Sequence, residues 1–544
     1  MISTRRRICR LLLGLIFFGA FLLLLYQLDV RSAFRRRNVL GMDGNASTSC
    51  KNLWGFSLPC SLTNQDGGGG STEHRSENEQ QRFLAALSAR ADPADRWIVL
   101  ALVDEAFIDM AVNLYETSFR RHGIENFLFV GVGHRTCEIL GGEPLRLSCF
   151  HYANDTHAEV ASVYRSVDFL RKMNLRTDMI LDALAAGYVV LHVDLDVVFL
   201  ANPLVYLRRL MTSSSITSAA HPPPDIATML DSSAYNAGFI VVRPTRNAIA
   251  VYELTKKITI DSPTIDDQTA LNSAIKEMSK KNKTKMTKKD AASEFRALAL
   301  NRGRYVCGVA YFERSKRWFP TAAGCPKCEV VHNNWIVGRE AKVYRFREHL
   351  MWMYDKNGYY SSRASRYLAY GNPPFRQVMT ANESAVRELR ALRNALAVGE
   401  ILDRIVILPR FHCFTFDTFE CPLNGILDMT AFDGVFSGRY RENSFLEHPK
   451  VPGDVKLNRS ASYRFLRSSG VVPPAEAPSS AKTVVFKQDR VTEGDVRRWF
   501  RDVGEKILVF HSLYGDFDFS TDAEIDEKYS KAFHRCDYRQ LKCG

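Results

Sequence analysis

Residues 188–204, "YVVLHVDLDVVFLANPL", form an apolar run that is interrupted by two aspartates, Asp194 and Asp196. A short apolar run of this kind predicts a buried β-strand. Because side chains alternate along a strand, both carboxylates are expected to point to the same side of its end. Carboxylate oxygens placed there suit a hard divalent cation, Mg²⁺ or Mn²⁺, that keeps positions open for a phosphate. The apolar neighbours make an ordinary solvated loop the weaker interpretation.

The segments before this run predict an alternation of strands and helices. "WIVLALV" (97–103) and "NFLFVGVG" (126–133) are typical of buried strands. Apolar residues recur at helical spacing between 107 and 119, and "TDMILDALAAG" (177–187) predicts a second helix that ends at its glycine. The alternation predicts an α/β fold in which ligands bind at the carboxyl ends of the strands, where Asp194 and Asp196 are found.

The stretch alone leaves two chemistries open. "VLHVDLDVV" (190–198) resembles the start of a haloacid dehalogenase-type phosphatase, in which Asp194 would be a nucleophile and Asp196 a general acid. Asp266 and Asp267 could then supply the later acidic pair of that family. In the alternative, a nucleotide-sugar transferase, the two aspartates hold a metal on the donor diphosphate. The remaining motifs have to decide between the two.

Two motifs follow the aspartates. "SAYNAGFIVVRPT" (233–245) places Asn236 and Gly238 just before an apolar strand, where glycine permits close approach and the amide can bind a hydroxyl. "TIDDQTALN" (264–272) adds a cluster whose acids and amide suit sugar hydroxyls or a developing oxocarbenium charge, Asp266, Asp267 and Gln268. An acid-rich first turn of a helix explains the second motif equally well.

A third motif, "VVHNNWIVGREAK" (330–342), follows another apolar strand. His332 at the end of that strand can be a third metal ligand, and Gly338 and Lys342 can approach a diphosphate. A lone histidine is more often structural, so His332 gains its value from the motifs that precede it.

Taken in order, these motifs resemble the nucleotide-diphospho-sugar transferase domain of glycosyltransferase family 77, over about residues 95–360. The resemblance implies a GT-A fold, a Rossmann-like mixed sheet with helices on both faces, and retaining transfer of xylose, arabinose or galactose. It also implies that Asp194, Asp196 and His332 bind Mn²⁺ (or Mg²⁺) with a UDP-sugar, and that Lys342 faces the phosphates.

The chemistry implied by this resemblance assigns roles to further residues. The metal and Lys342 would stabilise the negative charge of the departing phosphate. Asp267 and Gln268 are the catalytic candidates beside the oxocarbenium-like sugar, while Asn236, Gly238, Asp266 and Gly338 are expected to bind substrate. A covalent intermediate and same-face attack both remain open, as does a sugar-binding scaffold that has lost activity.

The N-terminal part predicts a membrane anchor. Residues 11–28, "LLLGLIFFGAFLLLLYQL", would span about 27 Å as a helix, and no A-x-A-like cleavage site follows them. Asparagine sequons and most of the cysteines lie beyond it, which favours an oxidising lumen. We expect a single-pass type II Golgi protein with a cytosolic tail (1–10), a luminal stem (29–93) and a transferase domain (94–375) that acts on a glycan or glycoprotein.

The remaining features narrow the class of protein. The formal net charge of +13 lies partly in arginines that flank the anchor, and no nucleic-acid-binding motif accompanies it, so no nucleic-acid partner is expected. Cys325 and Cys328 are expected to form disulfides rather than a zinc site. Residues 376–544 form a C-terminal extension of unassigned role, with a helix over 382–399 and a strand, "IVILP", over 405–409.

Overall fold

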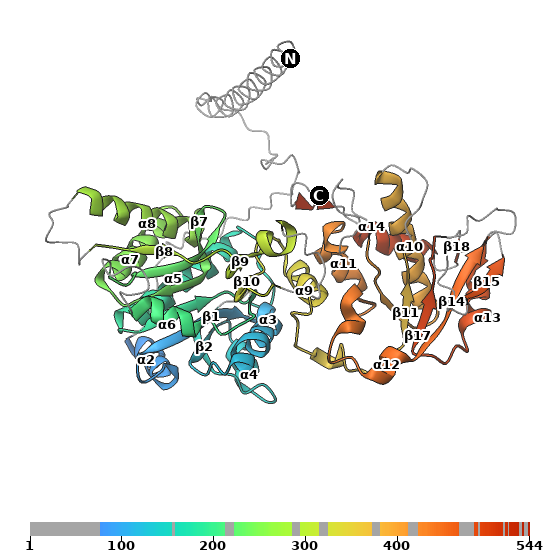
Figure 1. Ribbon diagram of the computed structural model, residues 1–544, viewed down its shortest axis with the longest axis horizontal. Helices are drawn as coiled ribbons and strands as arrows, with labels where there is room; N and C mark the ends of the chain where they lie inside the picture. Colours follow the sequence, from blue (N-terminus) through green and yellow to red (C-terminus); the bar gives the residue numbers. More distant parts are fainter. Residues whose placement is uncertain are drawn as a thin grey trace, which may run out of the picture. The chain divides into compact units, whose positions relative to one another are not determined.

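A seven-stranded mixed sheet forms the centre of the first domain (Figure 1). Its strand order is β3-β2-β1-β4-β7-β6-β8. Strands β3, β2, β1 and β4 run parallel, whereas β7 is antiparallel to both β4 and β6. The strands are β1 (Trp97–Asp104), β2 (Phe127–Val132), β3 (Cys149–Ala153), β4 (Val189–Val193), β6 (Ile226–Asp231), β7 (Ala234–Val242) and β8 (Ala297–Ala299). The strands predicted from the sequence at 97–103 and 126–133 are confirmed.

The computed structural model describes most of the chain beyond residue 76. The described residues are 77–154, 158–212, 222–284, 294–314, 325–372, 381–411, 423–466, 483–487, 490–514, 517–519, 522–532, 536–537 and 542–543. The expected cytosolic tail and anchor, and most of the expected stem, lie outside these residues. Within the described ranges, no helix is long and apolar enough to cross a membrane.

Helices cover both faces of the first sheet, as predicted. Alternate residues of β1 enter two separate cores: Val99 and Ala101 pack on one face, Ile98 and Leu100 on the other. The first face is covered by α3 (Ile108–Leu114), α4 (Thr136–Gly141) and α6 (Leu204–Thr212). The second face is covered by α2 (Glu77–Arg90), α5 (Val167–Ala185), α7 (Arg246–Asp261) and α8 (Asp267–Thr284).

Helix α2 corrects the expected boundary of the stem. Residues 77–90 are polar and fall within the expected luminal stem, 29–93. In the structure they form a helix whose Phe83 and Leu87 are fully buried against the sheet and α5. Two well-placed apolar side chains are enough to dock this helix, so the ordered domain begins before β1.

A small three-stranded sheet, β5-β10-β9, lies beside the end of β4. Its strands are β5 (Val197–Phe199), β9 (Tyr305–Cys307) and β10 (Val330–His332). Strand β10 pairs antiparallel with β5 and parallel with β9, so His332 stands opposite Val197. A disulfide joins Cys325 to Cys328 before β10; the sequence predicted disulfides for these cysteines without assigning their partners. The small sheet thus joins the segment after the two aspartates to the segment that ends at His332.

The C-terminal region contains a second domain around a six-stranded sheet of order β13-β12-β11-β17-β14-β15. All its strand pairs are parallel. The strands are β11 (Tyr367–Tyr370), β12 (Ile405–Ile407), β13 (Tyr440–Arg441), β14 (Arg459–Leu466), β15 (Thr483–Lys487) and β17 (Ile507–Phe510). Because β11 lies inside this sheet, the second domain begins before residue 376, where the sequence had placed the boundary.

Helices precede, connect and follow the parallel strands of the second domain. They are α9 (Arg339–Glu348), α10 (Ala381–Ile401), α11 (Met429–Phe436), α12 (Gly453–Leu457), α13 (Glu493–Phe500) and α14 (Asp522–Ala532). Of these, α9 comes before β11, and α14 comes after β17. The predictions of a helix over 382–399 and of a strand at "IVILP" are confirmed. Helix α9 directly follows the third motif of the first domain, and its residues Ala341 and Tyr344 pack into the core of the second.

Candidate metal and nucleotide-sugar site

The two aspartates lie in the tight turn between β4 and β5. The backbone N–H of Asp194 donates to the carbonyl of Gly238 at 2.7 Å, and the N–H of Asn333 donates to the carbonyl of Asp196 at 2.7 Å. These bonds fasten the turn to β7 and to the end of β10. The expected alternation along one strand is wrong, because the strand stops at residue 193 and the turn brings the carboxylates together.

His332 completes a group of three potential metal ligands with these aspartates. Its Nε2 atom lies 3.1 Å from Oδ1 of Asp196 and 3.7 Å from Oδ2 of Asp194. One ligand atom from each residue falls within 4.8 Å of the others. An ion with ligands at about 2.1 Å needs ligand atoms no more than about 4.2 Å apart, so small side-chain movements would suffice. The donor set fits Mn²⁺ or Mg²⁺.

Two cations compensate the charge of the aspartates. Arg176 on α5 donates from Nη1 to Oδ1 of Asp194 at 2.7 Å and from Nε to Oδ2 of Asp267 at 2.7 Å. Lys342 on α9 donates from Nζ to Oδ2 of Asp196 at 2.8 Å. Each aspartate therefore has one oxygen held by a cation and the other directed towards His332. The two cations offset the negative charge of the neighbouring carboxylates.

These contacts set the ionisation of the site. Burial alone would raise the pKa of both Asp194 and Asp196, but the charges of Arg176 and Lys342 outweigh it, and each pKa falls below its ordinary value. Burial would lower the pKa of His332, but the carboxylate of Asp196 outweighs that effect and raises it. Both acids are thus ionised at neutral pH, and metal binding would displace any proton that His332 carries.

Gly238 provides the space in which the ligands meet. A Cβ atom added to this glycine would come within 2.2 Å of Oδ2 of Asp194 and 2.6 Å of Cε1 of His332. Any side chain here would push two of the three ligands away. Gly238 thus permits a close approach of Asp194 and His332, and its expected role in substrate binding stays a prediction.

Asn236 and Gln268 are held in a polar network around Asp231. The amide of Asn236 donates to Oδ2 of Asp231 at 2.6 Å, and its oxygen accepts two backbone N–H groups of β7. Gln268 donates to the same Oδ2 at 3.3 Å and accepts the N–H of Ala237 at 3.0 Å. Asn236 is buried, and its amide nitrogen and oxygen already have hydrogen-bond partners. It therefore shapes β7, and the expectation that its amide binds a substrate hydroxyl is wrong.

The two adjacent acids at the start of α8 have different surroundings. Asp266 accepts the N–H of Thr269 at 2.8 Å, as a residue that caps a helix does. Asp267 is buried, and its carboxylate forms an ion pair with Arg176. Burial raises the pKa of Asp267, and Arg176 offsets part of that shift. Only Asp267 is linked to the metal ligands, through the guanidinium that it shares with Asp194.

Gly338 and Lys342 occupy the start of α9. Gly338 has a φ of 93°, and a Cβ atom there would meet Oγ1 of Thr430 in the second domain at 2.7 Å. This position requires glycine both for its backbone conformation and for the packing of α9 on α11. Lys342, one turn later, reaches the metal ligands directly.

Two residues of the site, Arg176 and Asp231, were missed from the sequence, and His192 was not expected to be a metal ligand. Arg176 lies inside an ordinary amphipathic helix, His192 inside an apolar strand, and Asp231 at the end of another strand. His192 is fully buried with Nε2 at 3.1 Å from Oδ1 of Asp194, and burial lowers its pKa. Histidine is less often fully buried than the apolar residues around it, so its place in this strand is the sequence signal for the contact with Asp194.

Comparison with known proteins agrees with this geometry. Residues 122–346 match the family model of nucleotide-diphospho-sugar transferases. An arabinosyltransferase of Arabidopsis thaliana is 22% identical over 433 residues, which cover 70% of this chain and 64% of that protein. A UDP-D-xylose:L-fucose alpha-1,3-D-xylosyltransferase of the same plant is 27% identical over 213 residues, which cover 36% of this chain and 54% of that protein.

A third relative comes from a different kind of organism. A UDP-galactose:fucoside alpha-3-galactosyltransferase of Dictyostelium discoideum is 25% identical over 202 residues, which cover 36% of this chain and 30% of that protein. The chain thus spans less than two thirds of the length of each of these relatives. Residues 122–346, which match the family model, contain every residue of the candidate site.

Proposed function

We propose, on the premise that residues 122–346 belong to the nucleotide-diphospho-sugar transferase family, that the protein is a metal-dependent, retaining glycosyltransferase of the GT-A type. The observation that carries the proposal is the meeting of Asp194, Asp196 and His332 at the carboxyl end of β4. Two ionised carboxylates and an imidazole at this place suit a divalent cation that binds the diphosphate of a sugar nucleotide.

The residues around the ligands would act on the two products of bond cleavage. When bound, Mn²⁺ or Mg²⁺ would supply Lewis-acid stabilisation of the leaving diphosphate. Lys342 donates a hydrogen bond to Asp196. From this position it would place a second positive charge beside the oxygens of the leaving diphosphate. Arg176 fixes the orientation of Asp194 and, through a second ion pair, holds Asp267 close to it.

The sugar would leave the diphosphate with oxocarbenium character. Asp267 and Gln268, at the start of α8, are the candidates to stabilise it. Asp266, next to Asp267, and Gly338, shortly before Lys342, are the further candidates to bind substrate. The named activities of the relatives make a pentose or galactose from a UDP-sugar the donor to test first. The acceptor would be a glycan or glycoprotein. With the apolar residues 11–28 as an anchor, the domain would act in the Golgi lumen as a type II protein.

Hydrolysis of UDP-sugars by the purified full chain tests this proposal. UDP-xylose, UDP-arabinose and UDP-galactose would be incubated with the protein, with EDTA and with EDTA followed by Mn²⁺. We expect UDP release from one donor, loss with EDTA and recovery with Mn²⁺. Cleavage of a phosphomonoester with an acyl-phosphate trapped on Asp194 would instead establish the phosphatase chemistry that the short stretch also allows. UDP binding without turnover would indicate a sugar-binding protein that lacks activity.

A further inference from the structure

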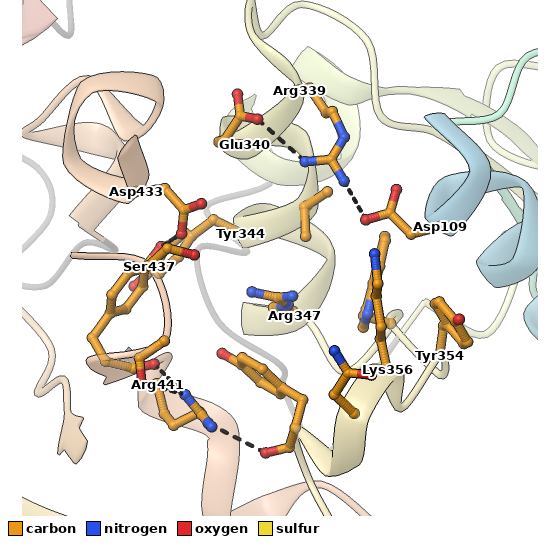
Figure 2. A pocket seen from close by; sticks show the side chains of 16 residues that line it. Asp109, Arg339, Glu340, Tyr344, Arg347, Tyr354, Lys356, Asp433, Ser437 and Arg441 are labelled. Atoms are coloured by element: carbon orange, nitrogen blue, oxygen red, sulfur yellow. Dashed lines mark hydrogen bonds and ion pairs between the residues drawn. The ribbon is translucent and has the colours of Figure 1, made fainter. Parts of the chain in front are cut away.

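A cavity of about 350 Å³ lies beside α9 (Figure 2). It is lined by Asp109 at the start of α3, by α9, by the segment 352–359 and by residues 433–441 of the second domain. We call it the α9 cavity. Its volume is at the lower end of the range for small-molecule sites, large enough for one sugar ring. None of the three motifs that define the candidate metal site predicts it.

A stack of two arginines on a tyrosine forms one wall of the α9 cavity. The guanidinium of Arg347 lies 4.1 Å from the ring centre of Tyr359, and that of Arg441 lies 3.9 Å from the same centre. The Tyr359 hydroxyl donates to Oε2 of the buried Glu442 at 2.7 Å. The ring is therefore fixed, and it holds both guanidinium planes in place.

In the described part of the chain, the cations that line the cavity, Arg339 excepted, form no ion pair with a carboxylate, although the charge of the nearby Glu442 acts on Arg347. Among the described residues, no carboxylate lies within 4.0 Å of the charged nitrogens of Arg347, Arg441 or Lys356. Arg441 donates to backbone carbonyls instead, and Nε of Arg347 is buried without a hydrogen-bond partner in the described part of the chain. Figure 2 shows the side chain of Arg347 in the middle of the cavity, with no ion pair drawn to it.

Acids line the opposite parts of the same cavity. Asp109 and Glu340 bind Arg339, and Asp433 accepts the hydroxyl of Tyr440 at 2.7 Å. Each carboxylate has further lone pairs that can accept a hydroxyl. A ligand with several negative charges would be repelled by these acids. A ligand with one negative group and several hydroxyls matches both walls.

We propose that the α9 cavity binds an anionic sugar unit, a hexuronate, with its carboxylate on Arg347 and Lys356 and its hydroxyls towards the acids. Arginine pairs with a carboxylate through two parallel, charge-assisted hydrogen bonds. This contact favours a hexuronate over a neutral sugar as the ligand. If the proposed transferase activity holds, this unit belongs to the acceptor glycan. Helix α9 would then connect acceptor binding to the donor site, since its Lys342 contacts Asp196.

Binding of glucuronate, glucose and inorganic phosphate to the full chain tests the proposal, by NMR saturation transfer and calorimetry without metal or UDP-sugar. We expect glucuronate to bind at least about tenfold more tightly than glucose and more tightly than phosphate. Arg347→Gln and Lys356→Ala should each weaken glucuronate binding, Arg347→Gln by about tenfold or more. Lys257→Ala, an exposed lysine on α7, is the matched control and should bind as the parent does.

The outcomes separate this proposal from the proposed activity. Equal binding of glucuronate and glucose, or unchanged binding in the folded Lys356→Ala variant, would overturn it. Phosphate binding that is tighter than glucuronate binding would also overturn it in favour of a simple anion site. A thermal melt shows whether Arg347→Gln loses binding because it unfolds. If it does unfold, glucuronate binding by Lys356→Ala decides whether the proposal stands. UDP-sugar hydrolysis is a separate readout, so either proposal can fail while the other stands.

Discussion

Asp196 and Glu348 are both buried acids, yet their surroundings give them opposite ionisation. Asp196 lies beside Lys342 and His332, whose charges outweigh burial and hold its pKa below the ordinary value. Burial, with the charge of Glu442 added to it, raises the pKa of Glu348 to about 8. Both residues are linked to α9. Asp196 contacts Lys342 of this helix, and Glu348 lies on the helix itself, six positions after Lys342. The difference shows that the local cations, and not burial, decide which buried acids remain available to a metal ion.

The charged member of this pair should matter most for activity. Asp196→Asn removes a metal ligand and leaves Lys342 and His332 without their anionic partner. We expect UDP-sugar hydrolysis to fall by about 10³-fold, equivalent to about 4 kcal/mol of transition-state stabilisation. Rates at saturating Mn²⁺ would measure this effect. Asp403→Asn, at an exposed position of the second domain, is the matched control, and an equal loss in both variants would refute the role of Asp196.

The neutral member should matter for stability, in a pH-dependent way. Between its ordinary pKa of 4.5 and about 8, the folded protein retains a proton on Glu348 that the unfolded chain releases. The free energy of unfolding therefore falls as the pH rises through this window. Glu348→Gln cannot ionise, so from pH 5 to pH 8 it should lose less stability than the parent, by roughly 3 kcal/mol.

Urea denaturation at both pH values measures this difference. Glu447→Gln, an exposed glutamate on the neighbouring segment, should follow the parent at each pH. If Glu348→Gln shows the same decline as the parent, Glu348 is ionised in the folded protein and the contrast with Asp196 fails.

A smaller effect is expected where the ligands are only displaced. Gly238→Ala places a Cβ atom within 2.2 Å of Asp194 and 2.6 Å of His332, which must then move apart. We expect a reduction of hydrolysis by about 100-fold, with a higher Mn²⁺ requirement. Gly434→Ala in α11 is the matched control, because an added Cβ meets nothing there within 4 Å. Full activity in Gly238→Ala would show that the ligands do not need their observed arrangement.

Much of the first domain could be predicted from the sequence because its signals are local. Apolar runs and helical periodicity identified β1, β2 and the helices before β4, and their order implied the α/β fold. Asp194, Asp196 and His332 were named as one site because their motifs occur in the order of the family that they resemble, and because the aspartates stand at the end of an apolar strand.

The parts that could not be predicted depend on contacts between distant residues. Arg176 is 18 residues from Asp194 and 91 from Asp267 in the chain, and nothing in its helix marks it as their common partner. The turn at residues 194–196 could not be distinguished from a continuous strand, because apolar residues flank it on both sides. Helix α2 depends on the burial of Phe83 and Leu87, which its polar composition concealed.

Titration of Mn²⁺ with the full chain, followed by electron paramagnetic resonance with and without UDP, tests the central claim most directly. The account predicts that the protein removes the free Mn²⁺ signal, that UDP tightens this binding by about tenfold or more, and that Asp194→Asn and Asp196→Asn abolish it. A parent protein that leaves the free Mn²⁺ signal unchanged in the presence of UDP, or aspartate variants that bind Mn²⁺ as tightly as the parent, would contradict it.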